Sequence, residues 1–183
     1  AGLEASLALG ADVIVHTDAD NQYCADDIPL LTAPILRGEA ELVIGERPIA
    51  EIAHFSPVKK ALQKLGSAVV RWLSRTDVRD APSGFRAIGR GAAMRLNVFS
   101  EYTYTLETII QAGQKGMAVT SVPVRVNGET RPSRLVSGLG SYVQRSVATM
   151  LRIFVTYRPL HAFATVGGVV FAAADGDVRL DLD

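Results

Sequence analysis

Two aspartates separated by one residue follow a run of β-branched residues. Asp18 and Asp20 come directly after residues 11–17 (ADVIVHT), which read as a short buried strand. Side chains just beyond the carboxyl end of a strand lie where open α/β sheets place their ligands. Carboxylates at this spacing can hold Mg²⁺ or Mn²⁺, with water and phosphate oxygens as the remaining ligands. A metal there would bridge a diphosphate and offset the charge that develops as the diphosphate leaves.

The acidic turn has a second interpretation, in which it only caps the next helix, because a D-x-D pattern often occurs by chance. Gln22 favours ligand binding, since its amide can hydrogen-bond a ligand hydroxyl or a water on the same turn. His16 lies inside the predicted strand and is expected to be packed. The single cysteine, Cys24, excludes an internal disulfide.

The composition fits one domain with a sizeable core, since the chain has 183 residues of which 48% are hydrophobic. The 19 basic and 19 acidic residues balance, so no nucleic-acid partner is expected. Strands alternate with helices, which predicts a mostly parallel sheet with helices on both faces. The predicted strands cover residues 11–17, 41–45 and 117–126, and the predicted helices cover residues 1–10, 26–38, 57–74, 90–96, 106–115 and 141–157.

Four motifs, in this order, resemble the dolichyl-phosphate mannose synthases and their bacterial relatives in glycosyltransferase family 2. Residues 18–22 (DADNQ) resemble the DAD-x-Q element, a DXD motif, and residues 43–47 (VIGER) resemble the V-I-G-S-R strand end. Residues 80–86 (DAPSGFR) resemble the D-x-x-S-G-F-R loop, and residues 130–134 (TRPSR) resemble the R-x-S-R element of a basic loop.

The resemblance implies a partial GT-A fold, a Rossmann-like three-layer α/β sandwich for nucleotide-diphospho-sugar transferases. The family's first strands carry a V-I-P-x-Y-N-E segment that is missing here, and the tail after residue 174 resembles neither the end of a membrane helix nor a natural cap. We therefore expect the chain to be truncated at both ends. Residues 1–140 would be the C-terminal part of the catalytic domain, and residues 141–160 an amphipathic interface helix. Residues 161–183 would be the remnant of a membrane segment with an aberrant tail.

The resemblance also implies roles for the residues of the first two motifs. Asp18 would hold the ribose or sugar side of the donor, and Asp20 the divalent metal on the diphosphate. Gln22 would assist the metal or the donor. Arg47 would bind the phosphate of a lipid acceptor.

The basic loop would contribute Arg131, which would reach the donor diphosphate, while Ser133 and Arg134 would support the loop. A solvated surface loop without such a role is the alternative. Lys59 and Gln63 occupy the region where relatives often carry an arginine and a serine four residues apart, and lysine lacks the bidentate geometry of arginine.

Two further residues are candidates for the site. Arg86 could line it or lock its loop by pairing with Asp80, and the pairing is favoured because an arginine–carboxylate pair forms easily at such a turn. Glu107 lies on a helix that faces the site in relatives.

The implied reaction is an inverting transfer from a GDP- or UDP-sugar to an undecaprenyl or dolichyl phosphate at the cytoplasmic face of the cell membrane. A phosphate acceptor is already anionic, so it needs positioning and charge neutralisation more than a general base. Two alternatives stay open. One is a family 2 transferase that acts on a polysaccharide or a soluble acceptor, and the other is a non-catalytic nucleotide-binding fragment.

The helix at residues 141–160 has an apolar face flanked by Arg145, Arg152 and Arg158, which suits the interface of an anionic bilayer. A core helix is the alternative. The mostly apolar run at residues 160–174 favours the membrane, although it is shorter than the roughly 18–20 residues that span a bilayer.

Overall fold

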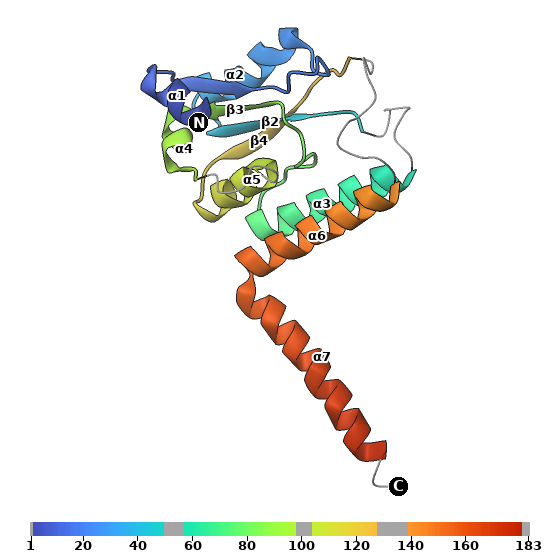
Figure 1. The fold of residues 1–183 in the computed structure, drawn as a ribbon. Helices are drawn as coiled ribbons and strands as arrows, with labels where there is room; N and C mark the ends of the chain where they lie inside the picture. Colours follow the sequence, from blue (N-terminus) through green and yellow to red (C-terminus); the bar gives the residue numbers. More distant parts are fainter. Residues whose placement is uncertain (1, 50–56, 98–103, 128–138, 181–183) are drawn as a thin grey trace.

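A four-stranded sheet forms the centre of the protein, seen in a computed structural model that describes residues 2–49, 57–97, 104–127 and 139–180 (Figure 1). Its strands are β1 (Val13–His16), β2 (Leu42–Glu46), β3 (Arg86–Gly89) and β4 (Val119–Pro123). They lie in the order β1-β3-β2-β4. The three predicted strands are therefore present within a few residues of their expected bounds.

The unexpected strand is β3, and it corrects the prediction of a mostly parallel sheet. It pairs antiparallel with both β1 and β2, whereas β2 and β4 are parallel. Its four residues, RAIG, carry only two apolar side chains and follow a turn-rich loop, so no period-2 pattern marks them as a strand. All four are buried, because β3 lies between two other strands.

Seven α-helices accompany the sheet in the described part of the chain. They are α1 (Gly2–Ala8), α2 (Ile28–Leu36), α3 (Pro57–Ser74), α4 (Arg90–Arg95), α5 (Tyr104–Gln114), α6 (Leu139–Tyr157) and α7 (Pro159–Leu180). A short 3₁₀ turn, Ala25–Asp27, leads into α2. The amphipathic pattern of α3 predicted both of its bounds correctly.

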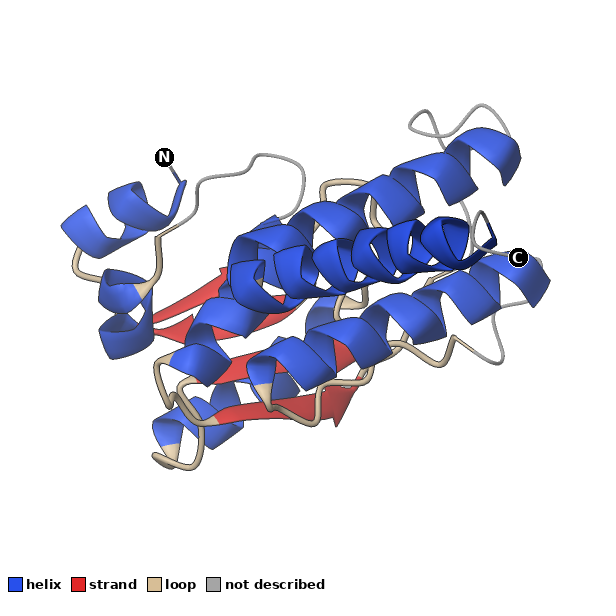
Figure 2. Ribbon diagram, turned by 90° about the horizontal axis from the view of Figure 1, so that it is seen from below, coloured by secondary structure: helices blue, strands red, loops and turns tan. Residues whose placement is uncertain are grey.

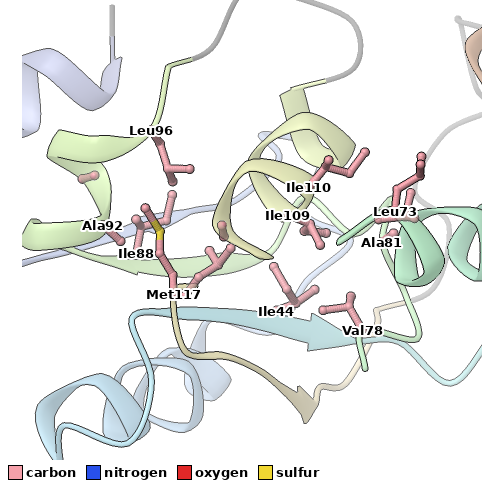
Figure 3. Close-up of a cluster of buried hydrophobic side chains, with 14 of the residues drawn as sticks. Ile44, Leu73, Val78, Ala81, Ile88, Ala92, Leu96, Ile109, Ile110 and Met117 are labelled. Atoms are coloured by element: carbon pink, nitrogen blue, oxygen red, sulfur yellow. The ribbon is translucent and has the colours of Figure 1, made fainter. Parts of the chain in front are cut away.

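Helices cover both faces of the sheet, which gives the predicted three layers. On one face, Leu31 of α2 packs with Val43, Phe85 and Ala87. On the other face, α3 and α5 cover the sheet, with α6 beside α3 (Figure 2). Figure 3 shows the core of this second face, where Leu73 and Ile109 from the helices meet Ile44 and Ile88 from the strands.

The last helix, α7, extends away from the body of the protein (Figure 1). It continues without a break through Asp175 and Asp177, where the sequence suggested an aberrant tail. None of the helices in the described ranges combines the length and the apolar character that crossing a membrane requires.

Candidate active site

The acidic turn follows β1, which is anchored in the core by Ile14. The strand ends at His16, and the backbone N–H of Gln22 donates to Oδ1 of Asp20 at 3.1 Å. Asn21 has φ of 59°, in the left-handed region that asparagine tolerates better than most residues. The two aspartates therefore sit at the carboxyl end of a strand, in a turn with a defined backbone.

The turn packs against the loop at residues 80–85 through a residue that the sequence did not single out. Tyr23 is buried, and its hydroxyl accepts a hydrogen bond from the backbone N–H of Gly84 at 3.2 Å. The same hydroxyl lies 3.5 Å from Oγ of Ser83, and the tyrosine ring packs against Phe85 at 5.0 Å between centroids. Tyr23 thus joins two of the four motifs into one site.

Gly84 lies directly against the carboxylate of Asp18. A Cβ atom placed on Gly84 would lie 2.5 Å from Oδ2 and 2.8 Å from Oδ1 of Asp18. Burial and the neighbouring charge of Asp20 raise the pKa of Asp18, while the charges of Arg47 and Arg86 act against that rise. The two carboxylates are thus close enough to repel each other, and a bound cation would remove this repulsion.

The carboxylates at this site suit a divalent ion that also binds oxygen atoms of a ligand. Across the described residues, no group of three or more His, Cys, Asp or Glu side chains could enclose a metal by itself. Mg²⁺ is commonly bound by one or two carboxylates together with water and substrate phosphates. Asp18 and Asp20 would hold such an ion, with Gln22 beside them on the same turn.

Arg47, at the end of β2, forms a two-pronged ion pair with Asp80. Its Nε lies 2.7 Å from Oδ2 and its Nη2 2.9 Å from Oδ1, and its backbone N–H donates to Oδ2 at 3.2 Å. Asp80 is fully buried. Burial alone would lower the pKa of Arg47, but hydrogen bonds to Asp80 and its charge outweigh burial, so the pKa is raised. The prediction that Asp80 pairs with Arg86 is therefore wrong, because Arg47 takes both carboxylate oxygens.

Arg86 instead ties its loop to α5. Its Nη1 donates to the carbonyl of Thr105 at 2.9 Å and to the hydroxyl of Thr108 at 2.8 Å. Its Nη2 donates to the carbonyls of Ala81 and Ser83. The side chain is completely buried, which lowers the pKa of Arg86 to about 10. These contacts tie the residues just before Gly84 to the side chain of Arg86, two residues after it.

No model of a known protein family matches the chain. Individual relatives do. Over 133 residues it is 33% identical to the UDP-N-acetylglucosamine–dolichyl-phosphate N-acetylglucosaminyltransferase of Methanococcus voltae, a match that covers 68% of this chain and 51% of that protein. The undecaprenyl-phosphate mannosyltransferase of Micrococcus luteus is 25% identical over 146 residues, which are 76% of this chain and 59% of that protein. These relatives are named glycosyltransferases, and they confirm the resemblance of the chain to that family.

Solved structures place the chain in the GT-A fold. Glucosyl-3-phosphoglycerate synthase from Mycobacterium tuberculosis, in complex with Mn²⁺, UDP and phosphoglyceric acid, superimposes with a TM-score of 0.60 at 17% identity, over 83% of this chain and 51% of that chain. The same enzyme with phosphoglyceric acid gives a TM-score of 0.59 at 20% identity, over 82% and 52%. The predicted partial GT-A sandwich is confirmed. The chain spans about half the length of these relatives.

The fold brings five of the predicted site residues into one region. Asp18 interacts electrostatically with Asp20, Arg47 and Arg86, and Gln22 lies on the same turn as Asp20. Their motifs are far apart in the sequence, and the sheet places the ends of β1 and β2 together with the start of β3.

The other predicted site residues fall elsewhere. Arg131, Ser133 and Arg134 lie outside the described residues. Lys59 belongs to the first turn of α3, but its side chain is not among those described. Glu107 is buried on α5 and interacts with Tyr157, which places it at the junction with α6.

Replacing Arg47 with lysine is expected to lower the free energy of unfolding by about 2 kcal/mol, in the range for hydrogen bonds to charged groups. Lysine keeps the charge but cannot contact both oxygens of Asp80. Urea denaturation checks this loss. The matched control is Arg37→Lys, because Arg37 makes a similar two-pronged pair with Glu39 on the exposed surface, where little change is expected. Equal losses in the two variants would show that burial of the Arg47 pair has no energetic consequence.

Proposed function

We propose that the full protein transfers a sugar from a UDP- or GDP-sugar to a polyprenyl phosphate, with Mg²⁺ or Mn²⁺ and with inversion at the anomeric carbon. The observation that carries this proposal is the acidic turn, in which Asp18 and Asp20 repel each other at a strand end while Gly84 lies against the carboxylate of Asp18. The acceptor class is supported by the relatives whose names specify dolichyl phosphate and undecaprenyl phosphate.

The side chains have separate tasks in this proposal. A divalent ion would neutralise the diphosphate as it leaves. Asp18 and Asp20 would hold that ion, and Gln22 would hydrogen-bond the donor. An oxygen of the lipid phosphate attacks the anomeric carbon, and the bond to the diphosphate breaks with its electron pair on the nucleotide. The acceptor is anionic before it attacks, so the chain needs no general base.

Arg47 would position the acceptor phosphate. Its Nε and Nη2 already bond Asp80, so the carboxylate fixes the plane of the guanidinium. A guanidinium held this way presents its Nη1 edge in one direction, and arginine is well suited to phosphate oxygens. Arg131 would bind the donor diphosphate from the basic loop.

We also propose that the protein works at the cytoplasmic face of the membrane. On α6, Val147, Leu151 and Val155 are 43%, 59% and 43% exposed, at intervals of four residues that place them on one face. On α7, Leu160, Phe163 and Val166 are also exposed. An uncovered apolar stripe beside the exposed Arg152 suits an anionic lipid surface. Sedimentation with vesicles that contain anionic lipid is the measurement that tests this placement.

The decisive experiment uses the full-length protein with labelled UDP- and GDP-sugars, a polyprenyl phosphate and Mn²⁺. Asp20→Asn is expected to lower transfer by about a hundredfold or more, because changes to residues that only support a metal ligand cost roughly 10–100-fold. Asp26→Asn is the control, since Asp26 is an exposed carboxylate only a few residues further on. Undiminished transfer by Asp20→Asn would refute the metal assignment.

The same assay separates the alternatives. A soluble phosphorylated acid is the second acceptor to include, because the superimposed synthase was solved with phosphoglyceric acid. Transfer to that acid and not to the lipid would point to a soluble acceptor. Mn²⁺-dependent nucleotide binding without any transfer would point to a non-catalytic nucleotide-binding protein.

A further inference from the structure

Asn127, just beyond β4, contacts three successive residues of the acidic turn. Its backbone N–H donates to the carbonyl of Gln22 at 2.8 Å. Its side-chain Nδ2 donates to the carbonyls of Asn21 at 3.0 Å and Tyr23 at 3.3 Å. One residue from the far side of the sheet therefore binds the backbone of the turn at three consecutive positions.

The two residues before Asn127 bind the part of the chain that follows the acidic turn. Val126 forms an antiparallel bridge with Tyr23. The backbone N–H of Arg125 donates to Oδ2 of Asp27 at 2.7 Å, and its Nε and Nη2 lie 2.9 and 2.6 Å from Oδ1. The hydrogen bonds from Arg125 lower the pKa of Asp27, which is only 2% exposed. The segment from the acidic turn to the start of α2 is thus fastened along its length.

We propose that Asn127 is a positioning residue that fixes the conformation of the acidic turn and so the relative placement of Asp20 and Gln22. The role in metal binding rests on the proposed function, whereas the conformational role does not. The turn's own hydrogen bond, from the N–H of Gln22 to Asp20, is local and leaves the left-handed residue Asn21 to be held from outside. Asparagine suits this place because its amide offers two N–H groups to two carbonyls.

The test is Asn127→Asp in the full-length protein. Aspartate has the same shape, but it offers no side-chain N–H and places oxygens against the carbonyls of Asn21 and Tyr23. We expect the dissociation constant for Mn²⁺, measured with UDP by titration and without any turnover, to rise about tenfold. We also expect faster hydrogen exchange of the amides at residues 20–23. The added negative charge alone would strengthen cation binding, so a weakening reports the conformation of the turn.

Two matched variants complete the design. Asn97→Asp adds the same charge at an exposed residue. The hydrogen bonds between Asn97 and Gln111 are made by backbone atoms of Asn97, so this variant should change neither the Mn²⁺ affinity nor the hydrogen exchange at residues 20–23. Asn127→Leu removes the donors without adding charge and should repeat the effect of Asn127→Asp. All titrations are run well below the thermal midpoint, so that partial unfolding does not contribute.

The outcomes are distinguishable. Unchanged exchange at residues 20–23 in both Asn127 variants would overturn the proposal. Faster exchange with Mn²⁺ affinity equal to or above that of the unmodified protein would overturn the positioning of the metal ligands. If the unmodified protein fails to bind Mn²⁺ while exchange still accelerates in the variants, the metal assignment of the proposed function fails and the conformational role of Asn127 stands.

Discussion

Replacing Gly84 with alanine is expected to weaken metal-dependent nucleotide binding strongly while the fold remains intact. The new Cβ would lie 2.5, 2.8 and 2.9 Å from three atoms of the Asp18 carboxyl group, closer than such atoms can approach. The backbone on the glycine side has little freedom to move, because Gly84 is bonded to Tyr23 and the adjacent Ser83 to Arg86. The carboxylate of Asp18 must therefore turn away, and its short side chain allows this without unfolding the core.

The expected loss is about a hundredfold in nucleotide affinity with Mn²⁺, the upper end of the 10–100-fold loss that follows from disturbing the groups around a metal ligand. Calorimetric titration with UDP or GDP, with and without Mn²⁺, measures it. The matched control is Gly91→Ala on α4, where nothing lies within 4 Å of the new Cβ. Unaltered affinity in Gly84→Ala would show that Asp18 need not occupy its observed position.

Replacing Gly113 with alanine is expected to lower the free energy of unfolding by about 3 kcal/mol, the upper end of the usual range for overpacking. The new Cβ would lie 1.9 Å from the carbonyl oxygen of Ser74 and 2.7 Å from its carbonyl carbon. These are backbone atoms at the buried end of α3, so the clash cannot be relieved by a side-chain rotation. Relief requires α3 and α5 to separate, which opens the core around Leu73 and Ile109.

Urea denaturation of Gly113→Ala tests this expectation, with Gly66→Ala as its control. Gly66 lies inside α3 with no atom within 4 Å of the added Cβ, so alanine there should stabilise the helix by roughly 0.5–1 kcal/mol. The two substitutions are chemically identical and should have opposite signs. A loss in Gly113→Ala no larger than the effect of Gly66→Ala would mean that α3 and α5 lie further apart than the structure shows.

Features that depend only on neighbouring residues could be predicted from the sequence. The β-branched run before Asp18 predicted a strand that ends in an acidic turn, and that is where β1 and the turn lie. Apolar residues at helical spacing predicted both ends of α3. The four motifs indicated the family, which the relatives confirm. These signals are visible in the sequence because each is complete within a short stretch of chain.

Which distant residues become partners depends on how the sheet and helices pack. Strand β3 has too few apolar residues to be recognised, and it became a strand because β1 and β2 provided hydrogen bonds on both sides. Arg47 lies 33 positions from Asp80, and Asn127 lies 106 positions from Asn21. Composition and spacing do not show which arginine pairs with a given carboxylate. Only the packing of the sheet fixes which guanidinium reaches it with both nitrogens, so the choice of Arg47 over Arg86 could not be read from the sequence.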